Sequence, residues 1–267
     1  MKLYLQTDLE GVAGVINVAD YLGPDGRCYE VGRRLLTAEV NAAVRGFAAG
    51  GFDDIVVADG HGAGAVNFEL LDTRVRLMRG WPTGWPLLLD GSYNALAFVG
   101  QHSKACTPFG HIPHTQSWHY VDLSLNGISI GEYGQLVLCA QEMKVPVIMA
   151  AGDAAFCREA LALTPWVETA IGKQGTTPTS GEELDEDAYA HSHETAIHWH
   201  PEVVRGRIEA AALKAARRFA ADRSQFGFVD IRPPYRLVAR FRRRRDAEPR
   251  QVVRDHPSSI IEVMNMR

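Results

Sequence analysis

The feature that most constrains the fold is the alternation of short apolar runs with helical patterns through the first 160 or so residues. Apolar runs of this kind, separated by helices, are typical of strands buried on both faces of a mostly parallel sheet. The pattern predicts strands at residues 3–7, 54–58, 95–100 and 145–150, and helices at residues 29–49, 132–144 and 154–163.

The organisation changes near Lys173. Residues 121–130 enclose Asn126-Gly127 and predict a hairpin, whereas residues 175–201 are rich in Thr, Glu, Asp and His and predict a long loop. A helix is expected at 203–221 and a strand at 230–241, interrupted by two prolines. We therefore expect an α/β fold with a mostly parallel sheet flanked by helices in residues 1–172. A smaller C-terminal α+β domain with a histidine-rich loop is expected in residues 173–267.

Composition excludes several classes of protein. The formal net charge is −4, and the basic run Arg242–Arg245 lacks interleaved aromatic residues, so we expect no nucleic-acid partner. No apolar stretch approaches the roughly 20 residues that a membrane helix needs, and the chain opens directly into a strand-like run without a signal-peptide pattern. The four cysteines form no CxxC pair, which favours a reducing compartment, and we expect the cytoplasm.

Metal-ligand residue types follow the first three predicted strands. Asp8 and Glu10 follow the first strand, Asp59 and His61 end the second, and His102 ends the third. Because ligands bind beyond the carboxyl ends of strands in an open α/β sheet, these side chains are expected to converge. Carboxylates mixed with imidazoles suit zinc, with manganese or iron as alternatives. The other interpretation is that the aspartates cap helices and the histidines are solvated loop residues.

The densest group of histidines lies elsewhere, at His191, His193, His198 and His200. His193-Glu194 and His198 superficially resemble the HExxH motif, but the histidines are five residues apart rather than four and do not share a helix face. We predict that this group is not the metal site, because it lies outside the strand ends. The segment instead fits a border of the active-site mouth or an oligomer contact.

A series of short motifs runs in order through residues 1–175. The motifs are Asp8-Leu9-Glu10-Gly11, Tyr29-Glu30-x-Gly32-Arg33, Thr37-x-Glu39-x-Asn41, Asp59-Gly60-His61, Gly100-x-His102, Thr107-Pro108, His114-Thr115, Gly131-Glu132-x-Gly134, Val145-Pro146-Val147, Ala151-Gly152-Asp153 and Lys173-Gln174. This series resembles the bacterial zinc D-aminopeptidases of the dipeptide-permease operon (DppA type). The resemblance is much weaker after residue 175.

The resemblance implies a site and an activity. It places two zinc ions on Asp8 (bridging), Glu10, His61, His102 and Glu132. It also implies His114 as the catalytic histidine; Glu132 and His114 come from the resemblance and not from the strand pattern. The implied protein is a binuclear zinc aminopeptidase that hydrolyses short peptides or amides with N-terminal D-amino acids. It would be a two-domain α/β protein that forms a homo-oligomer, with a decamer as the family form.

The chain also departs from the family pattern. One more residue than expected separates His102 from His114, and His111 and His119 lie nearby. The family's Asp-Ser-His-Ser is Asp59-Gly60-His61-Gly62 here, residues 175–201 resemble an insertion, and the C-terminus stops about one helix early. These departures bear on substrate choice and assembly. Two alternatives stay open: another metal-dependent amidase or phosphoesterase, and a non-catalytic peptide-binding protein of the same fold.

Overall fold

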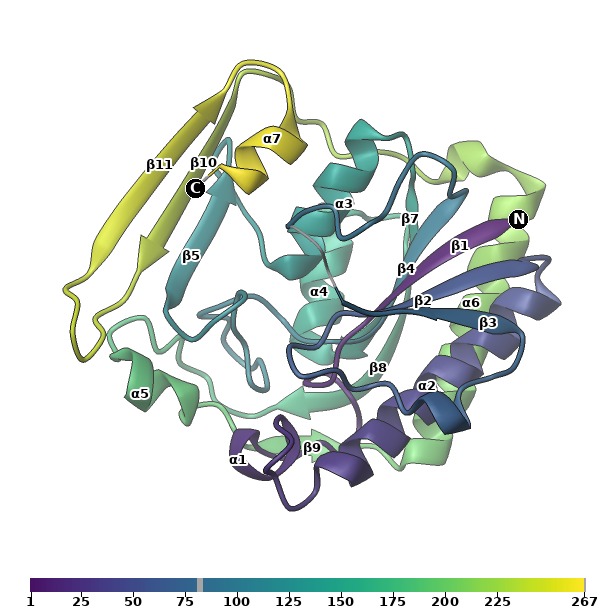
Figure 1. The fold of residues 1–267 in the computed structure, drawn as a ribbon, viewed down its shortest axis with the longest axis horizontal. Helices are drawn as coiled ribbons and strands as arrows, with labels where there is room; N and C mark the ends of the chain where they lie inside the picture. The colour runs from purple at the N-terminus through teal and green to yellow at the C-terminus, as the bar shows by residue number, and fades with distance from the viewer. Residues whose placement is uncertain (81–83, 267) are drawn as a thin grey trace.

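The larger of two sheets contains the first strands of the chain, as the apolar runs predict (Figure 1). The computed structural model describes residues 1–80 and 84–266. The larger sheet has the strand order β3-β2-β1-β4-β7-β8-β9, parallel except for β9. Its strands are β1 (Lys2–Thr7), β2 (Asp54–Asp59), β3 (Val75–Met78), β4 (Ala95–Gln101), β7 (Val147–Asp153), β8 (Glu168–Gly175) and β9 (Ala196–His198).

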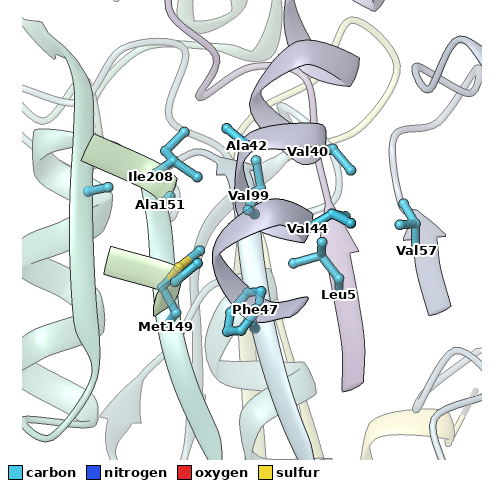
Figure 2. Close-up of a cluster of buried hydrophobic side chains, with 14 of the residues drawn as sticks. Leu5, Val40, Ala42, Val44, Phe47, Val57, Val99, Met149, Ala151 and Ile208 are labelled. Atoms are coloured by element: carbon cyan, nitrogen blue, oxygen red, sulfur yellow. The ribbon is translucent and has the colours of Figure 1, made fainter. Parts of the chain in front are cut away.

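Helices cover both faces of this sheet. One face packs against α2 (Tyr29–Ala49) and α6 (Pro201–Ala221), and the other against α3 (Glu132–Glu142) and α4 (Ala154–Leu163). Figure 2 shows the first core, where Val44 and Phe47 of α2 and Ile208 of α6 meet strand residues such as Leu5 and Val99. Burial on both faces explains why these strands are continuous apolar runs.

The helices α2 and α6 approach each other closely because two glycines face the contact. A Cβ on Gly46 would lie 2.3 Å from the Glu209 carbonyl oxygen, and one on Gly50 would lie 2.2 Å from the Ala216 Cβ. Only residues without a side chain fit at these two positions. Helix α6 is thereby packed against α2 on one face of the larger sheet.

A smaller antiparallel sheet lies beyond α3 (Figure 1). Its order is β11-β10-β5-β6, with β5 (Tyr120–Leu125), β6 (Ile128–Ser129), β10 (Tyr235–Phe241) and β11 (Arg250–His256). Its inner face packs on α3 and on α7 (Ile260–Asn265). The remaining elements are α1 (Val18–Tyr21), α5 (Glu186–Ala190) and the 3₁₀ turns η1 (Phe68–Leu70) and η2 (Arg223–Gln225). Among the described residues, no helix combines the length and apolar character needed to cross a membrane.

Most expected elements are confirmed, including the helix at 29–49 and the hairpin around Asn126-Gly127. The expectation of a long loop over 175–201 is wrong in two places, because α5 and β9 form there. The strand expected at 230–241 begins only at Tyr235, after the two prolines, which cannot donate to a ladder.

The two sheets do not divide the chain at residue 172. Strand β9 and helix α6 belong to the larger sheet and its cover, whereas β5 and β6 belong to the smaller sheet. Each sheet thus contains strands from both sides of residue 172. The division of the chain into two domains at this position stays a prediction.

Candidate metal centre

The carboxyl ends of three neighbouring parallel strands meet at one edge of the larger sheet. Strand β1 lies between β2 and β4, with Thr7 paired to Asp59 on one side and to Val99 on the other. The residues that follow therefore leave the sheet side by side. Asp8 and Glu10 follow β1, while His61 and His102 follow β2 and β4.

One group of potential ligand atoms combines Asp8, Glu10 and His61. His61 Nδ1 lies 3.3 Å from Asp8 Oδ1 and 3.2 Å from Glu10 Oε2. The other ring nitrogen of His61, Nε2, donates to the Leu22 carbonyl at 2.8 Å. This bond fixes the tautomer, so the Nδ1 lone pair of the neutral ring faces the carboxylates, as in histidines that bind metals.

The second group combines His102, Glu132 and His114. His102 Nδ1 donates to the Ser103 carbonyl at 2.9 Å. His102 Nε2 lies 3.3 Å from Asp8 Oδ2 and 3.6 Å from Glu132 Oε1, and within the described residues this buried atom has no hydrogen-bond partner. A buried imidazole nitrogen that has no hydrogen-bond partner and lies beside two carboxylates is suited to bind a cation through its lone pair.

Asp8 lies between the two groups. Its Oδ1 faces His61 and its Oδ2 faces His102, so one carboxylate contacts both sides of the site. Gln101 Nε2 donates to Asp8 Oδ2 at 2.8 Å and reaches Glu132 Oε2 at 3.4 Å. The backbone N–H of Leu9 donates to Asp8 Oδ1 at 2.8 Å. These contacts hold the carboxylate in the orientation that a bridging ligand requires.

The separations fit zinc. Two ligand atoms about 2.0–2.1 Å from one ion at the tetrahedral angle lie roughly 3.3–3.4 Å apart. Three of the four nitrogen–oxygen separations in this site are 3.2 or 3.3 Å, and the fourth, to Glu132, is 3.6 Å. The residues present therefore suit a pair of zinc ions, with His61 on one side and His102 on the other.

The carboxylates favour positive charge at both histidine nitrogens. Burial alone would lower the pKa of His61, but Glu10 and Asp8 outweigh burial and raise the pKa to about 12. Glu132 and Asp8 likewise raise the pKa of His102 well above its ordinary value despite burial. Although burial opposes it, the two histidines hold the pKa of Asp8 well below its usual range. A bound ion supplies the same positive charge and displaces the protons.

His114 reaches the site from the loop between β4 and β5. Its ring stacks on His102 with centroids 3.9 Å apart and also contacts Trp118. Nδ1 donates to the Ile112 carbonyl at 3.0 Å, which leaves Nε2 as the free nitrogen. Burial and the charge of His102 lower the pKa of His114, so the ring is neutral near pH 7.

The other two histidines near His114 lie away from the carboxylates. His111 is buried against the carbonyls of Ile16 and Glu194, and His119 packs edge-on against Phe241 under the smaller sheet. Of the three histidines between 111 and 119, the structure brings only His114 to the strand-end cluster.

A cavity of about 470 Å³ opens over the cluster. The polar part of its wall includes Asp8, Glu10, His61 and Glu132, and the apolar part includes Trp85, Leu87, Phe98, Trp118 and Leu136. Among the described lining residues there is no lysine or arginine. The cavity therefore combines a cluster of potential metal ligands with an apolar wall.

Asp59 and Lys104, which lie close to the ligand groups in the sequence, make other contacts. Asp59 accepts from the backbone N–H groups of Ala65 and Val66, at 2.9 and 3.1 Å, and so fixes the loop that begins at His61. Lys104 Nζ donates to the carbonyl and hydroxyl oxygens of Ser129, outside the cavity. Sequence reasoning missed Gln101, although its position at the end of β4, beside His102, is a usable signal.

The histidines between 191 and 200 serve separate local contacts. His193 forms hydrogen bonds with Ser192 and with the Thr179 carbonyl, and exposed His191 lies 3.7 Å from Glu194. His198 accepts a hydrogen bond from the backbone N–H of Gly14. His200 caps α6 by accepting one from the backbone N–H of Glu202. Within the part of the chain that is described, none of them belongs to a group of three potential ligands.

Comparisons with known proteins agree with this fold and identify the family. The family model described as D-aminopeptidase (peptidase M55) matches residues 1–256. A D-aminopeptidase of Bacillus subtilis (strain 168) is 31% identical over 177 residues, which are 65% of this chain and 64% of the relative. The alignment thus spans less than two thirds of that relative.

A solved structure has the same fold. It is the Zn-dependent D-aminopeptidase DppA from Bacillus subtilis, a self-compartmentalizing protease, with a TM-score of 0.81 and 22% identity. The match covers 99% of this chain and 94% of that one. It confirms the expected α/β architecture, and the family match confirms the resemblance carried by the sequence motifs. The chain belongs to the D-aminopeptidase family, peptidase M55.

Proposed function

We propose that this protein is a zinc-dependent aminopeptidase that hydrolyses short peptides or amides with N-terminal D-amino acids. The observation that carries the proposal is the placement of Asp8 between two histidines whose second nitrogens are each bound to a backbone carbonyl. The names of the family and of both Bacillus subtilis relatives support the substrate class.

The proposed ligands are Asp8, Glu10, His61, His102 and Glu132, with Asp8 bridging two zinc ions. Zinc, when bound, polarises a carbonyl and lowers the pKa of a water molecule. Gln101 orients Asp8 and Glu132 through its carboxamide. Glu132 is the most open of the five, with 22% of its side chain exposed, and it also accepts from Gln116 N at 2.7 Å.

The ligand set favours a metal-dependent enzyme over a non-catalytic peptide binder. Three carboxylates line the cavity without a lysine or arginine among the described lining residues, and the proposed zinc ions would balance their charge. A peptide binder has no need of these carboxylates beside His61 and beside the unpartnered Nε2 of His102. The choice of an amide over a phosphoester rests on the names of the family and its relatives.

His114 is proposed as the acid/base residue. Its Nε2 is free while its Nδ1 is held by the Ile112 carbonyl, and its lowered pKa leaves it able to accept a proton near neutral pH. From this position it can move a proton to the leaving amine.

We also propose that the protein acts as a homo-oligomer, in the manner of the relative described as self-compartmentalizing, with a decamer as the specific form. Short peptides would then be the substrates because the assembly restricts access. Multi-angle light scattering tests this point: a large ring-sized species is expected, and a monomer at micromolar concentration removes the proposal.

The activity is tested with a panel containing D-Ala-D-Ala, its N-acetylated form, an L-Ala dipeptide and a phosphoester. We expect hydrolysis of the free D-dipeptide alone or far ahead of the others, with close to two zinc ions per chain by atomic emission. Protein that holds no transition metal and is not activated by added zinc contradicts the proposal. Preferential cleavage of the phosphoester contradicts it as well.

A further inference from the structure

Gln6 is a buried polar residue in the cavity wall that no step above uses. It lies on β1, two residues before Asp8, and only 7% of it is exposed. Its Oε1 is buried and has no hydrogen-bond partner among the described residues. An unpartnered amide oxygen at a cavity wall is costly unless something that enters the cavity binds the amide.

The neighbouring strand makes room for this amide. Residue 60, at the end of β2, is a glycine, and a Cβ there would lie 2.0 Å from Gln6 Nε2. The Gln6 carboxamide thus occupies space that a side chain at residue 60 would fill, so the two residues form a matched pair.

The amide lies beside apolar residues of the cavity wall and close to the ligand cluster. Gln6 pairs with Phe98 across β1 and β4, and Phe98, Leu87 and Leu136 line the same cavity. Gln6 and Asp8 are two residues apart, which places their side chains on the same side of an extended chain. A substrate whose scissile group lies near Asp8 can therefore bring the tip of its first side chain to Gln6.

We propose that Gln6 selects the first side chain of the substrate and that the preferred side chain is extended and neutral, with a carboxamide or hydroxyl at its tip. Rotation of the Gln6 carboxamide about its last side-chain bond turns either its N–H donor or its oxygen acceptor toward the substrate. This suits a substrate side chain whose tip can both donate and accept a hydrogen bond. The apolar lining around Gln6 disfavours a charged tip, because burying an unpaired charge is costly. This inference rests on the proposed aminopeptidase function and adds the identity of the first residue to it.

A matched pair of substrates and a matched pair of variants test the proposal. D-Glutamine amide and D-methionine amide have side chains of similar length and differ mainly in the polar tip. The wild-type protein should hydrolyse the glutamine amide with the higher kcat/KM. In Gln6→Met the ratio of the two kcat/KM values should fall by about tenfold or more, since the cost of a lost buried hydrogen bond is of that order.

Gln135→Met is the matched control. Gln135 is also a buried glutamine with an unpartnered Oε1, but it does not line the cavity. Its substitution should leave the ratio unchanged. Should Gln6→Met fail to fold, Gln6→Leu is a second variant with the same expectation, and the wild-type ratio alone already tests the proposal.

Binding of the free amino acids gives a readout that needs no turnover. Calorimetry on the zinc-loaded protein should show tighter binding of D-glutamine than of D-methionine, with the preference lost in Gln6→Met. A wild-type protein that treats both amides alike, or a Gln6→Met variant with an unchanged ratio, overturns the role of Gln6 and leaves the proposed function intact. If no amide is hydrolysed at all, the proposed function fails, and the calorimetric preference still decides whether Gln6 selects the side chain.

Discussion

Two groups of histidines in this protein differ in the contacts that their two ring nitrogens make. His61 and His102 each bind a backbone carbonyl with one nitrogen and turn the other toward carboxylates. His198 and His200 instead accept hydrogen bonds from backbone N–H groups, which occupies the nitrogen that would otherwise be a ligand. The density of histidines along the chain and the contacts of their ring nitrogens therefore point to different places in the molecule.

The largest effect is expected when the shared carboxylate is removed. Asp8→Ala should reduce tight zinc from close to two ions per chain to near zero, because Asp8 contacts both histidine groups. Turnover should fall below detection. Zinc content after gel filtration in a weak chelator is the measurement. A variant that keeps one or both ions tightly would show that Asp8 does not bridge.

A smaller effect on activity is expected when His114 is removed, because it is proposed to transfer a proton rather than to bind the metal. His114→Ala should lower kcat by about 10²–10⁴-fold, the usual contribution of an acid/base group, while zinc content stays near two. His119→Ala is the control, because His119 is as buried as His114 but packs against Phe241. Loss of zinc from His114→Ala would move His114 from the proton-transfer role to the ligand set.

The smallest effect on the site is expected from the histidine-rich segment. Replacing His191, His193, His198 and His200 with glutamine should leave tight zinc and turnover of a small amide nearly unchanged. The free energy of unfolding should fall by about 1–3 kcal/mol, because local hydrogen bonds to the backbone are weakened. Thermal melts and zinc analysis on one preparation measure both. If tight zinc is lost while the fold stays intact, the comparison above is reversed.

The proximity of Asp8, Glu10, His61 and His102 could be predicted from the sequence because they share one property: each follows the end of a buried parallel strand. Glu132 and His114 could be reached only through the family resemblance. Glu132 is the first residue of a helix, and His114 lies in a loop, so no periodic pattern connects either with the sheet. The assignment of all six to their chemical roles stays a prediction.

Three strands were missed for a different reason. Strands β3, β8 and β11 are partly polar, and β11 (RQVVRDH) has only two apolar residues because it is the exposed edge of the smaller sheet. A single sequence does not distinguish such segments from polar loops, since the pairing of their backbones, rather than burial of both faces, determines the strand. The same applies to β9 within residues 175–201.

The close packing of α6 on α2 has a consequence for the order in which the chain folds during synthesis. Helix α6 ends at Ala221, so Val44, Phe47 and the strand residues beneath them stay uncovered until most of the polypeptide has left the ribosome. The nascent chain thus carries the strand ends with Asp8, His61 and His102 long before the larger sheet is complete. An exposed apolar face of this kind is the surface that chaperones recognise, and it is prone to aggregation. We expect newly made protein to depend on such protection more than the finished molecule does.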